Sequence, residues 1–590
     1  MTSGLLKQRD ILLLSKNAAL VLLVRPPPVN VPSFGKKVAV CAVAVANMRD
    51  YDEVTAFLGG WRTHQKLLFA LLSVSVIPNG FSGLSIIFVG DVPEHRCLIP
   101  ENLNLSEAWR NRTIPLQGPE QQRSKCTRYR LDVILNLSQT FPDPDFLNMS
   151  EIEQEPCLDG WEYSKEQYIS TIVTEWDLVC NNDWKEPFVT SVYFMGMLVG
   201  SISFGILSDR FGRKIVMFGT MVLQVTFDVL ITFSPNLEIF CLINFFKGFG
   251  EVSNFVAVFV LGSELLEQSI RVTYSTLGVG TCFAVGYMIL PFAAYFIREW
   301  KMLILTLSLT CLLYIPLWWF IPESPRWLLS KGRIEEAESI IRLMAKKNGV
   351  TPPAMLFSED ELEHIKNNKI KSVPVTQLLK TCNTRTITII NILIWMIVTM
   401  GYYCLSLNIP NLYGDDYLNC FLFAASEIPA NIAVWILLQK FPRKFSLSSI
   451  LFLSGSILLF RQLIPSHFLL LAVVLVLIGN FGNTCAFCII YVYTAELYPT
   501  SLRNTGVGVS SMASRIGSII SPYIIFLDTY QENLSLIVIG VLTMFAAIAV
   551  LFLPETFKVP LPDNIEQMQK IYWIKSTRLV HSNLGKNEIK

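Results

Sequence analysis

The stretch Gly205-Ile-Leu-Ser-Asp-Arg-Phe-Gly-Arg-Lys214 decides how this chain is organised, because it places four charged residues between two long apolar runs. The runs cover residues 187–207 and 215–234. Each is close to the length of about 20 apolar residues that crosses a bilayer as a helix. Short loops rich in Lys and Arg stay on the cytoplasmic side of a membrane. The stretch therefore predicts a tight cytoplasmic turn between two transmembrane helices.

The rest of the chain repeats this pattern. A second basic loop, Lys440-Phe-Pro-Arg-Lys444, follows another apolar run. The chain is 52% hydrophobic and only 16% charged, whereas soluble proteins carry about 25% charged residues. A bilayer is the natural solvent for such a composition. The apolar runs predict twelve transmembrane helices, at 66–88, 187–207, 215–234, 239–263, 272–296, 302–321, 386–407, 418–439, 447–464, 467–493, 504–527 and 535–553.

The segment between the first two spans, residues 89–186, is expected outside the cell, because the alternation of sides places it opposite the basic loops. It holds nine Lys and Arg against eighteen Asp and Glu. Its four N-glycosylation sequons, and a fifth at Asn533, all fall on the side predicted to be external. Four cysteines in an oxidising compartment predict two disulfides, with three pairings open. The residues concerned are the sequons Asn104, Asn111, Asn136 and Asn148 and the cysteines Cys97, Cys126, Cys157 and Cys180.

Residues 1–47 do not fit the rest, since their apolar pieces are too short to span a membrane. A signal peptide is a weaker interpretation than an extension that is dispensable or wrongly assigned, because Met48 begins a start-like sequence. The helical spacing of Ile334–Lys347 predicts helices along the inner membrane face, although a plain solvated connector fits as well. We expect a cytoplasmic N-terminus at 48–65, six-helix halves at 66–321 and 386–554, a cytoplasmic linker at 322–385 and a cytoplasmic tail at 555–590.

Enzyme signatures are missing from the sequence, which has neither a Gly-x-Ser-x-Gly elbow nor a His-Glu-x-x-His pair. The five histidines show no metal-ligand spacing, and a net charge of +1 implies no nucleic-acid partner. Two sets of six spans around a large middle loop suit a transporter of two similar halves, with the site between them near the middle of the bilayer. We therefore expect no enzyme activity, catalytic residue, metal site or cofactor.

Three motifs carry a family resemblance. Gly205–Lys214 resembles the loop signature of the major facilitator superfamily, and Pro322-Glu-Ser-Pro-Arg-Trp327 resembles a mark shared by sugar porters and organic ion transporters. Glu496-Leu-Tyr-Pro-Thr500 with Arg503 resembles the organic ion transporters specifically. The resemblance implies an all-α membrane protein with the major facilitator fold, twelve helices in two halves and a large extracellular loop after the first helix. It implies gating roles for Asp209, Arg210, Gly212, Arg213, Glu323, Arg326, Glu496 and Arg503.

A finer resemblance covers nearly all of residues 48–570. Met48–Gly59, Pro93–Cys97, Ser170–Trp176 and Tyr491–Glu496 resemble the organic cation/carnitine transporters of solute carrier family 22. That family implies a plasma-membrane secondary transporter of carnitine, related zwitterions and organic cations, with Na⁺ as the coupling ion for carnitine. One alternative is a sodium-independent carrier of ergothioneine or organic cations. Another is a receptor or scaffold that does not transport. The C-terminal Glu588-Ile-Lys590 lacks the apolar end by which relatives bind PDZ domains.

Carnitine pairs a quaternary ammonium, which suits aromatic faces, with a carboxylate, which needs a buried cation. Arg515 lies inside an expected span, and the family resemblance assigns it to the carboxylate; the alternative is a structural partner for Glu427. Glu427 itself is a candidate cation or gating site. The aromatic candidates also fit plain packing, and Asn79, at a break in the first span, is the candidate for sodium. The remaining substrate candidates are Trp395, Tyr402, Phe487, Tyr491, Gln224, Asn254 and Phe255.

Three departures from the family pattern bear on the substrate. Asn480 stands where relatives carry Lys or Arg, and Phe255 stands where carnitine carriers have Tyr. Lys247 and Glu251 are additional charges one helical turn apart, so we expect them to pair with each other. These departures weaken the case for carnitine as the main substrate but leave transport itself untouched.

Overall fold

The computed structural model describes residues 51–559 and Pro562, apart from 104, 118–121, 142–148, 150–151, 359–374 and 500–501. The described residues belong to one unit that runs from Tyr51 to Lys590. The expected extension 1–47 and most of the tail 555–590 lie outside the described residues.

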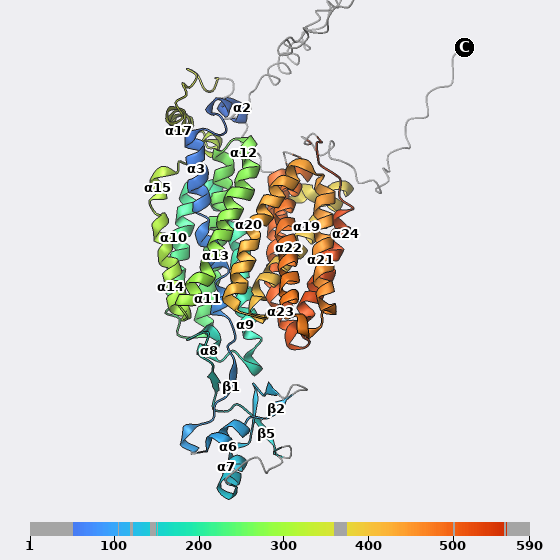
Figure 1. Cartoon of the computed structure of the whole chain (residues 1–590). Helices are drawn as coiled ribbons and strands as arrows, with labels where there is room; N and C mark the ends of the chain where they lie inside the picture. Colours follow the sequence, from blue (N-terminus) through green and yellow to red (C-terminus); the bar gives the residue numbers. More distant parts are fainter. Residues whose placement is uncertain are drawn as a thin grey trace, which may run out of the picture. The chain divides into compact units, whose positions relative to one another are not determined.

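Each of the twelve expected apolar runs lies in helical structure. Among the described residues, ten helical segments are long and apolar enough to cross a membrane, and α23 and α24 complete the twelve. Helices before and after the linker form two neighbouring groups (Figure 1). The first group is α3 (Thr63–Val74), α4 (Ile77–Gly83), α5 (Ile86–Val89), α9 (Lys185–Phe211), α10 (Arg213–Ile231), α11 (Leu237–Leu265), α12 (Gln268–Thr273), the π-helix η6 (Tyr274–Gly280), α13 (Thr281–Phe296), α14 (Trp300–Thr310), η7 (Cys311–Tyr314) and α15 (Leu317–Phe320).

The second group holds α19 (Cys382–Leu407), α20 (Asp416–Lys440), α21 (Arg443–Phe460), α22 (Leu469–Leu497), α23 (Arg503–Phe526) and α24 (Leu534–Val550). Short 3₁₀ turns join several of these helices, among them η8 (Val375–Leu379), η9 (Ile409–Asn411), η10 (Arg461–Leu463), η11 (Ser466–Phe468) and η12 (Leu527–Thr529).

Small residues set how closely the helices approach. A Cβ on Gly196 of α9 would lie 2.0 Å from the carbonyl oxygen of Phe245, and one on Gly248 of α11 would lie 2.3 Å from that of Tyr193. Such mutual contact is the packing that glycine permits between membrane helices, where apolar burial supplies no driving force. Helices α9 and α11 are therefore held backbone to backbone.

The first span is broken twice, by turns at Ser75–Val76 and Leu84–Ser85, and Pro78, Asn79 and Gly80 lie in the short helix between the two breaks. Helix α3 ends at Val74, and α4 and α5 follow as short pieces. Gly80 lies so close to α13 that a Cβ there would meet the Phe283 carbonyl oxygen at 2.2 Å. The break thus places the polar Asn79 side chain, which is buried, among neighbouring helices.

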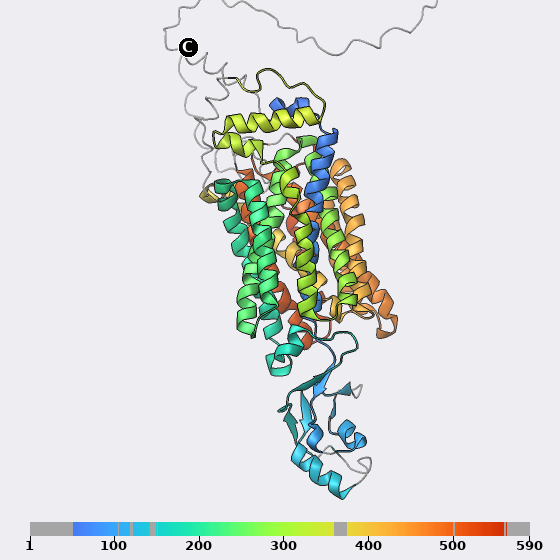
Figure 2. The ribbon, with the colours of Figure 1, turned by 90° about the vertical axis from the view of Figure 1, so that its left-hand side faces the viewer.

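Residues 90–184, here called the loop domain, lie beyond one end of the helices (Figures 1 and 2). Three antiparallel strand pairs form its framework, and its core contains Trp109, Tyr129 and Ile134. The elements are β1 (His95–Cys97) paired with β6 (Trp161–Tyr163), β2 (Leu116–Gln117) with β3 (Gln122–Arg123), β4 (Thr127–Tyr129) with β5 (Gln154–Pro156), and the helical pieces η2 (Glu101–Leu103), α6 (Glu107–Arg112), α7 (Leu131–Thr140), α8 (Ile172–Trp176) and η5 (Cys180–Asn182).

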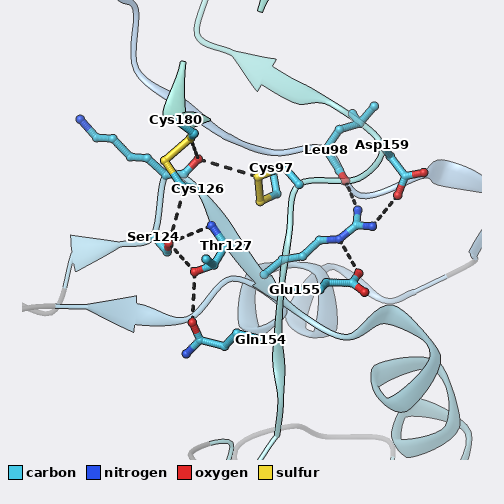
Figure 3. The surroundings of a disulfide bond; sticks show 12 residues. Cys97, Leu98, Ser124, Cys126, Thr127, Gln154, Glu155, Asp159 and Cys180 are labelled. Atoms are coloured by element: carbon cyan, nitrogen blue, oxygen red, sulfur yellow. Dashed lines mark hydrogen bonds and ion pairs between the residues drawn. A yellow bond between two sulfur atoms is a disulfide. The ribbon is translucent and has the colours of Figure 1, made fainter. Parts of the chain in front are cut away.

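The four cysteines of the loop domain form two disulfides, Cys97–Cys157 and Cys126–Cys180 (Figure 3). Beside them the buried guanidinium of Arg128 donates to Glu155 at 2.9 Å, to Asp159 at 2.6 Å and to the Leu98 carbonyl at 2.7 Å. This arrangement satisfies a buried cation with two carboxylates. The sequon asparagines Asn111 and Asn136 are exposed, while Asn104 and Asn148 lie outside the described residues.

The opposite end of the helices carries α2 (Tyr51–Thr55), η1 (Ala56–Leu58), α16 (Pro325–Ser330) and α17 (Ile334–Lys347). Figure 2 shows α17 lying across this end. Its apolar face, including Ile341 and Met344, packs against Val54, Leu58 and Trp327. Ile334–Lys347 is therefore a packed helix rather than a plain solvated connector.

Candidate functional site

Four of the predicted aromatic residues form one cluster between α19 and α22. The rings of Trp395 and Tyr491 are 4.4 Å apart, and Phe487 lies 5.4 Å from Tyr491. Tyr402 stacks on Phe487 at 5.8 Å. The indole N–H of Trp395 donates to the Thr494 hydroxyl at 2.8 Å, and this hydrogen bond fixes the orientation of the ring. The cluster presents π-faces of the kind that attract a quaternary ammonium.

Glu427 of α20 joins this cluster through Tyr402, whose hydroxyl donates a 2.7 Å hydrogen bond to the carboxylate. The glutamate is buried, with 3% of its surface exposed. Buried carboxylates need such donors, because the loss of hydration is otherwise uncompensated. A negative group therefore sits beside the aromatic faces, where it would favour a cation further.

Arg515 of α23 is buried, with 6% of its surface exposed, and its Nε has no hydrogen-bond partner. No ion pair joins it to a carboxylate in the part of the chain that the structure describes, so it is not the partner of Glu427. Its guanidinium interacts electrostatically with the ring hydroxyls of Tyr403 and Tyr491. The structure thus holds a cation without a counter-charge next to the aromatic cluster.

Two polar candidates of the N-terminal group, Asn79 and Asn254, meet at the broken first span. The Asn79 amide donates to the Asn254 side-chain oxygen at 3.1 Å, and Asn254 donates to the Met217 carbonyl at 2.8 Å. The side-chain oxygen of Asn79 and the amide nitrogen of Gln224 are buried without partners. Phe255, which follows Asn254 in α11, lies edge-on to Phe283 with ring centroids 6.1 Å apart.

The expected pair of Lys247 with Glu251 is wrong. The Lys247 ammonium instead lies 3.0 Å from the carboxylate of Asp228 on α10, and it donates to the Ser85 hydroxyl at 3.3 Å. Spacing along one helix favoured Glu251, but a neighbouring helix brought a carboxylate closer. Asn480 is also buried, and neither of its amide atoms has a hydrogen-bond partner.

The predicted gating residues of the N-terminal group gather at the end that carries α17. Arg213 lies 3.0 Å from Asp209 and 3.2 Å from Glu264. Glu323 accepts from the backbone N–H groups of Arg213 and Lys214 at 3.0 and 3.1 Å, which suits an anion at the start of α10. Gly212 precedes that start with φ of 105°, a conformation that favours glycine.

The C-terminal group repeats this arrangement. Arg443 lies 3.2 Å from Glu496, and Glu555 accepts from the backbone N–H groups of Arg443 and Lys444 at 2.9 and 3.1 Å. Arg503 donates to the Ala495 carbonyl at 2.8 Å. Each half therefore contains an equivalent arginine, whose side chain pairs with one glutamate and whose backbone N–H donates to another. Such an internal repeat is expected of a two-half transporter.

The remaining gating candidates differ in their surroundings. Arg326 lies 3.4 Å from Asp52, which also binds Arg271 at 2.7 Å. Arg210 is exposed and lies over its neighbour Phe211. These contacts tie the described N-terminal segment to the same end of the helices.

Several site residues were missed from the sequence. Tyr403 follows Tyr402 directly and faces Arg515, and Asp228 is a lone acid within an apolar run. An ionisable residue in a span is a signal that could have identified Asp228. Glu555 was detectable as well, because Pro554-Glu-Thr556 repeats Pro322-Glu-Ser324 in the other half.

Comparisons with known proteins agree with this geometry. The family described as sugar (and other) transporters matches residues 157–568. Organic cation/carnitine transporter 2 of Mus musculus is 53% identical over 535 residues, which cover 90% of this chain and 96% of that protein. Its namesake from Homo sapiens is 53% identical over 532 residues, covering 90% and 95%. Solute carrier family 22 member 4 of Mus musculus is 50% identical over 527 residues, covering 89% and 95%.

Solved structures show the same fold. The inward open conformation of the xylose transporter XylE from E. coli has a TM-score of 0.55 at 14% identity, covering 84% of this chain and 97% of that chain. The chain is thus a multi-pass membrane transporter with the major facilitator fold, and not an enzyme. Within that class it belongs to solute carrier family 22, among the organic cation/carnitine transporters.

Proposed function

We propose that this protein is a plasma-membrane secondary transporter that moves carnitine, or a small zwitterion like it, by alternating access. The observation that carries the proposal is the buried guanidinium of Arg515, which has no carboxylate partner among the described residues, beside the aromatic cluster and Glu427. A zwitterion with a quaternary ammonium at one end and a carboxylate at the other matches both parts of this arrangement.

Arg515 supports recognition of the carboxylate on energetic grounds. A buried charge without a counter-charge costs several kcal/mol, and a substrate carboxylate removes much of that cost. Guanidinium also offers two parallel donors, which fit a carboxylate better than a lysine ammonium does. Substrate binding is then coupled to the arrangement of the helices around α23, since the relief exists only where the carboxylate reaches Arg515.

The two groups of helices meet at the aromatic cluster, which supports an alternating mechanism. Phe259 of α11 lies 6.3 Å from Tyr491 of α22, and Phe194 of α9 lies 4.7 Å from Tyr403 of α19. Near the loop domain, Ser191 donates to the Ile519 carbonyl at 2.8 Å, and Gln167 donates to Asp416 at 2.5 Å. Rocking of one group against the other would make and break these contacts.

Sodium coupling is part of the proposal, with Asn79 as the residue that would contribute to the ion site. Its unpartnered, buried side-chain oxygen is a hard ligand of the type that alkali cations take, and it lies in a broken helix. A bound Na⁺ would add a positive charge at this site, and the Na⁺ gradient would drive its entry. Asn254, which already contacts Asn79, would hold that amide in position.

The orientation is proposed from the loop domain. Its two disulfides and the exposed sequons Asn111 and Asn136 suit an extracellular compartment, which leaves both termini in the cytoplasm. Phe255, which stands where carnitine carriers have Tyr, favours a second candidate function, a sodium-independent carrier of ergothioneine or organic cations. A receptor or scaffold without transport has no use for a buried Arg515 that lacks a carboxylate partner among the described residues.

An uptake panel tests the proposal. Cells expressing the protein are given carnitine, ergothioneine or tetraethylammonium, with Na⁺ or with a large inert cation in its place. We expect carnitine uptake that falls when Na⁺ is removed. Sodium-independent uptake of ergothioneine or tetraethylammonium alone would support the second candidate. No uptake of any of the three, at normal surface abundance, would favour the scaffold.

A further inference from the structure

A second cluster of buried charges lies in the N-terminal group, apart from Arg515 and Glu427. Asp228, Lys247 and Glu251 are exposed by only 2%, 4% and 3%. Lys247 and Asp228 form an ion pair at 3.0 Å. Glu251 has no ion-pair partner among the described residues, and its Oε2 has no hydrogen-bond partner. With all three ionised the cluster carries one uncompensated negative charge among buried side chains.

The surroundings of Glu251 offer little to neutralise it. The hydroxyls of Tyr193 on α9 and Ser82 on α4 are the neutral donors beside the Glu251 carboxylate, and Gly83 of α4 faces it directly. The titratable groups that interact with Glu251 are Lys247 on its own helix, Asp228 on α10, Tyr193 on α9, Tyr403 on α19 and Cys311 on η7. Lys247 is the only cation among these groups, and Asp228 already binds it.

We propose that Glu251 is a proton-binding site of the transport cycle, held beside the Asp228–Lys247 ion pair. A proton from water adds to Oε2 of Glu251, which becomes a neutral carboxylic acid, and the charge of the cluster changes from −1 to 0. The proton returns to water when the cycle exposes the group to the other side. This inference rests on the proposed function, since it assigns a further ligand to the same transporter.

A proton fits this place better than a metal cation does. A proton needs one oxygen atom, whereas a cation needs several and would be repelled by the adjacent Lys247 ammonium. No group of three or more His, Cys, Asp or Glu side chains arranged to hold a metal occurs in the described part of the chain. The cluster therefore also differs from the proposed sodium site at Asn79.

A pocket adjoins the cluster. Lys247, Tyr193 and Ser85 line it together with Val89 and Ile231, which end α5 and α10. Ser82, Thr190 and Asn244 add further polar groups to its wall. The cluster therefore borders a partly polar space rather than close-packed apolar side chains alone.

Tyr403 connects this cluster with the proposed substrate site, because it interacts electrostatically with both Glu251 and Arg515. Through Tyr403, a substrate carboxylate bound at Arg515 would make the potential around Glu251 less positive. Substrate binding therefore favours proton binding, and by thermodynamic reciprocity proton binding favours the substrate. The two should be carried in the same direction.

Infrared spectroscopy of the purified full-length protein tests proton binding without requiring transport. The wild type should show a carboxylic acid carbonyl band that appears as pH falls. Glu251→Gln should lack this band, while the control Glu238→Gln, an exposed glutamate on the same helix, should retain it. A wild-type band that persists unchanged in Glu251→Gln, or no band at any pH, would overturn the proposal.

Uptake into liposomes tests the coupling. Wild-type affinity for carnitine should rise about five-fold or more as pH falls, which is the lower range of typical coupling between sites. Glu251→Gln should give pH-independent affinity, and Glu251→Asp should retain the dependence. Uptake with an unchanged pH profile in Glu251→Gln would refute the proton site but leave the proposed function standing. Failure of all uptake would refute the proposed function, while the infrared titration would still decide the proton site.

Discussion

The hydroxyl of Tyr402 donates a 2.7 Å hydrogen bond to the carboxylate of Glu427, which joins α19 to α20 inside the C-terminal group. The same tyrosine stacks on Phe487, so one residue positions both a negative group and an aromatic face. Its ring and its hydroxyl therefore have separable roles.

Tyr402→Phe keeps the ring and removes the donor. An unsatisfied buried acceptor costs about 1–3 kcal/mol, so we expect a lower thermal midpoint and weaker uptake of organic cations. Thermal unfolding in detergent and tetraethylammonium uptake measure the two effects. Tyr523→Phe, at an exposed position of α23, is the control and should behave like the wild type. An unaltered midpoint for Tyr402→Phe would mean that water replaces the hydroxyl.

Arg515→Gln should abolish uptake of carnitine while the protein still reaches the surface. The proposed partner of Arg515 is the substrate carboxylate, and loss of one partner from a buried ion pair costs about 3–5 kcal/mol. Lysine cannot restore the two-donor contact. Tetraethylammonium has no carboxylate, so its uptake should be preserved or increased. Arg385→Gln, at an exposed position of α19, is the matched control. Equal loss of both uptakes would show that Arg515 serves the transport cycle and does not recognise the carboxylate.

The Lys247–Asp228 pair predicts strong non-additivity. Lys247→Val leaves Asp228 buried without its counter-charge and should destabilise the protein by about 3–5 kcal/mol. The double variant with Asp228→Val removes both charges and should recover most of that loss. Thermal midpoints of the two single variants and the double variant form the cycle. Purely additive changes would contradict a direct ion pair.

Lys247 also bears on why Asn480 can replace the Lys or Arg of relatives. If Lys247 supplies the positive charge that relatives carry in the tenth span, Asn480→Lys alone should impair uptake. Combination with Lys247→Val should then restore uptake, provided that Asp228→Val is included to avoid the unpaired acid. Uptake measured at equal surface abundance checks this. No recovery in the combined variant would rule out compensation.

The loop domain should be glycosylated at its exposed sequons. Asn111→Gln and Asn136→Gln should each lower the apparent mass of protein from animal cells, and glycosidase should remove the difference. Cys126→Ser should lower surface abundance sharply, since loss of a native disulfide costs about 2–5 kcal/mol. Cys382→Ser, at an exposed free cysteine, is the control. No mass shift for either asparagine variant would contradict the proposed orientation.

The sequence predicted the helices well because a membrane span depends on the length of an apolar run, and that length can be read from a single sequence. A break in the first span was expected at Pro78-Asn79-Gly80; the structure keeps these residues in a short helix and places the turns on either side, at Ser75–Val76 and Leu84–Ser85. The strand pairs of the loop domain were not predicted. They are two or three residues long and depend on disulfides and long-range pairing rather than on local pattern.

The candidate site was predicted in part. The aromatic cluster follows from spacing along α19 and α22, and the structure brings its members together. The partner of Lys247 could not be found in this way, because spacing along one helix does not reveal which neighbouring helix faces it. Tyr403 was missed for the same reason, since its importance lies in what α23 and α11 place around it.

The two disulfides of the loop domain interleave, with Cys126 lying between Cys97 and Cys157, and Cys157 between Cys126 and Cys180. A single proteolytic cut anywhere between Cys97 and Cys180 is therefore bridged by at least one bond. The first helix would remain covalently attached to the other eleven after such a cut. A nicked protein would run as one band on a gel without reductant and as two bands with it.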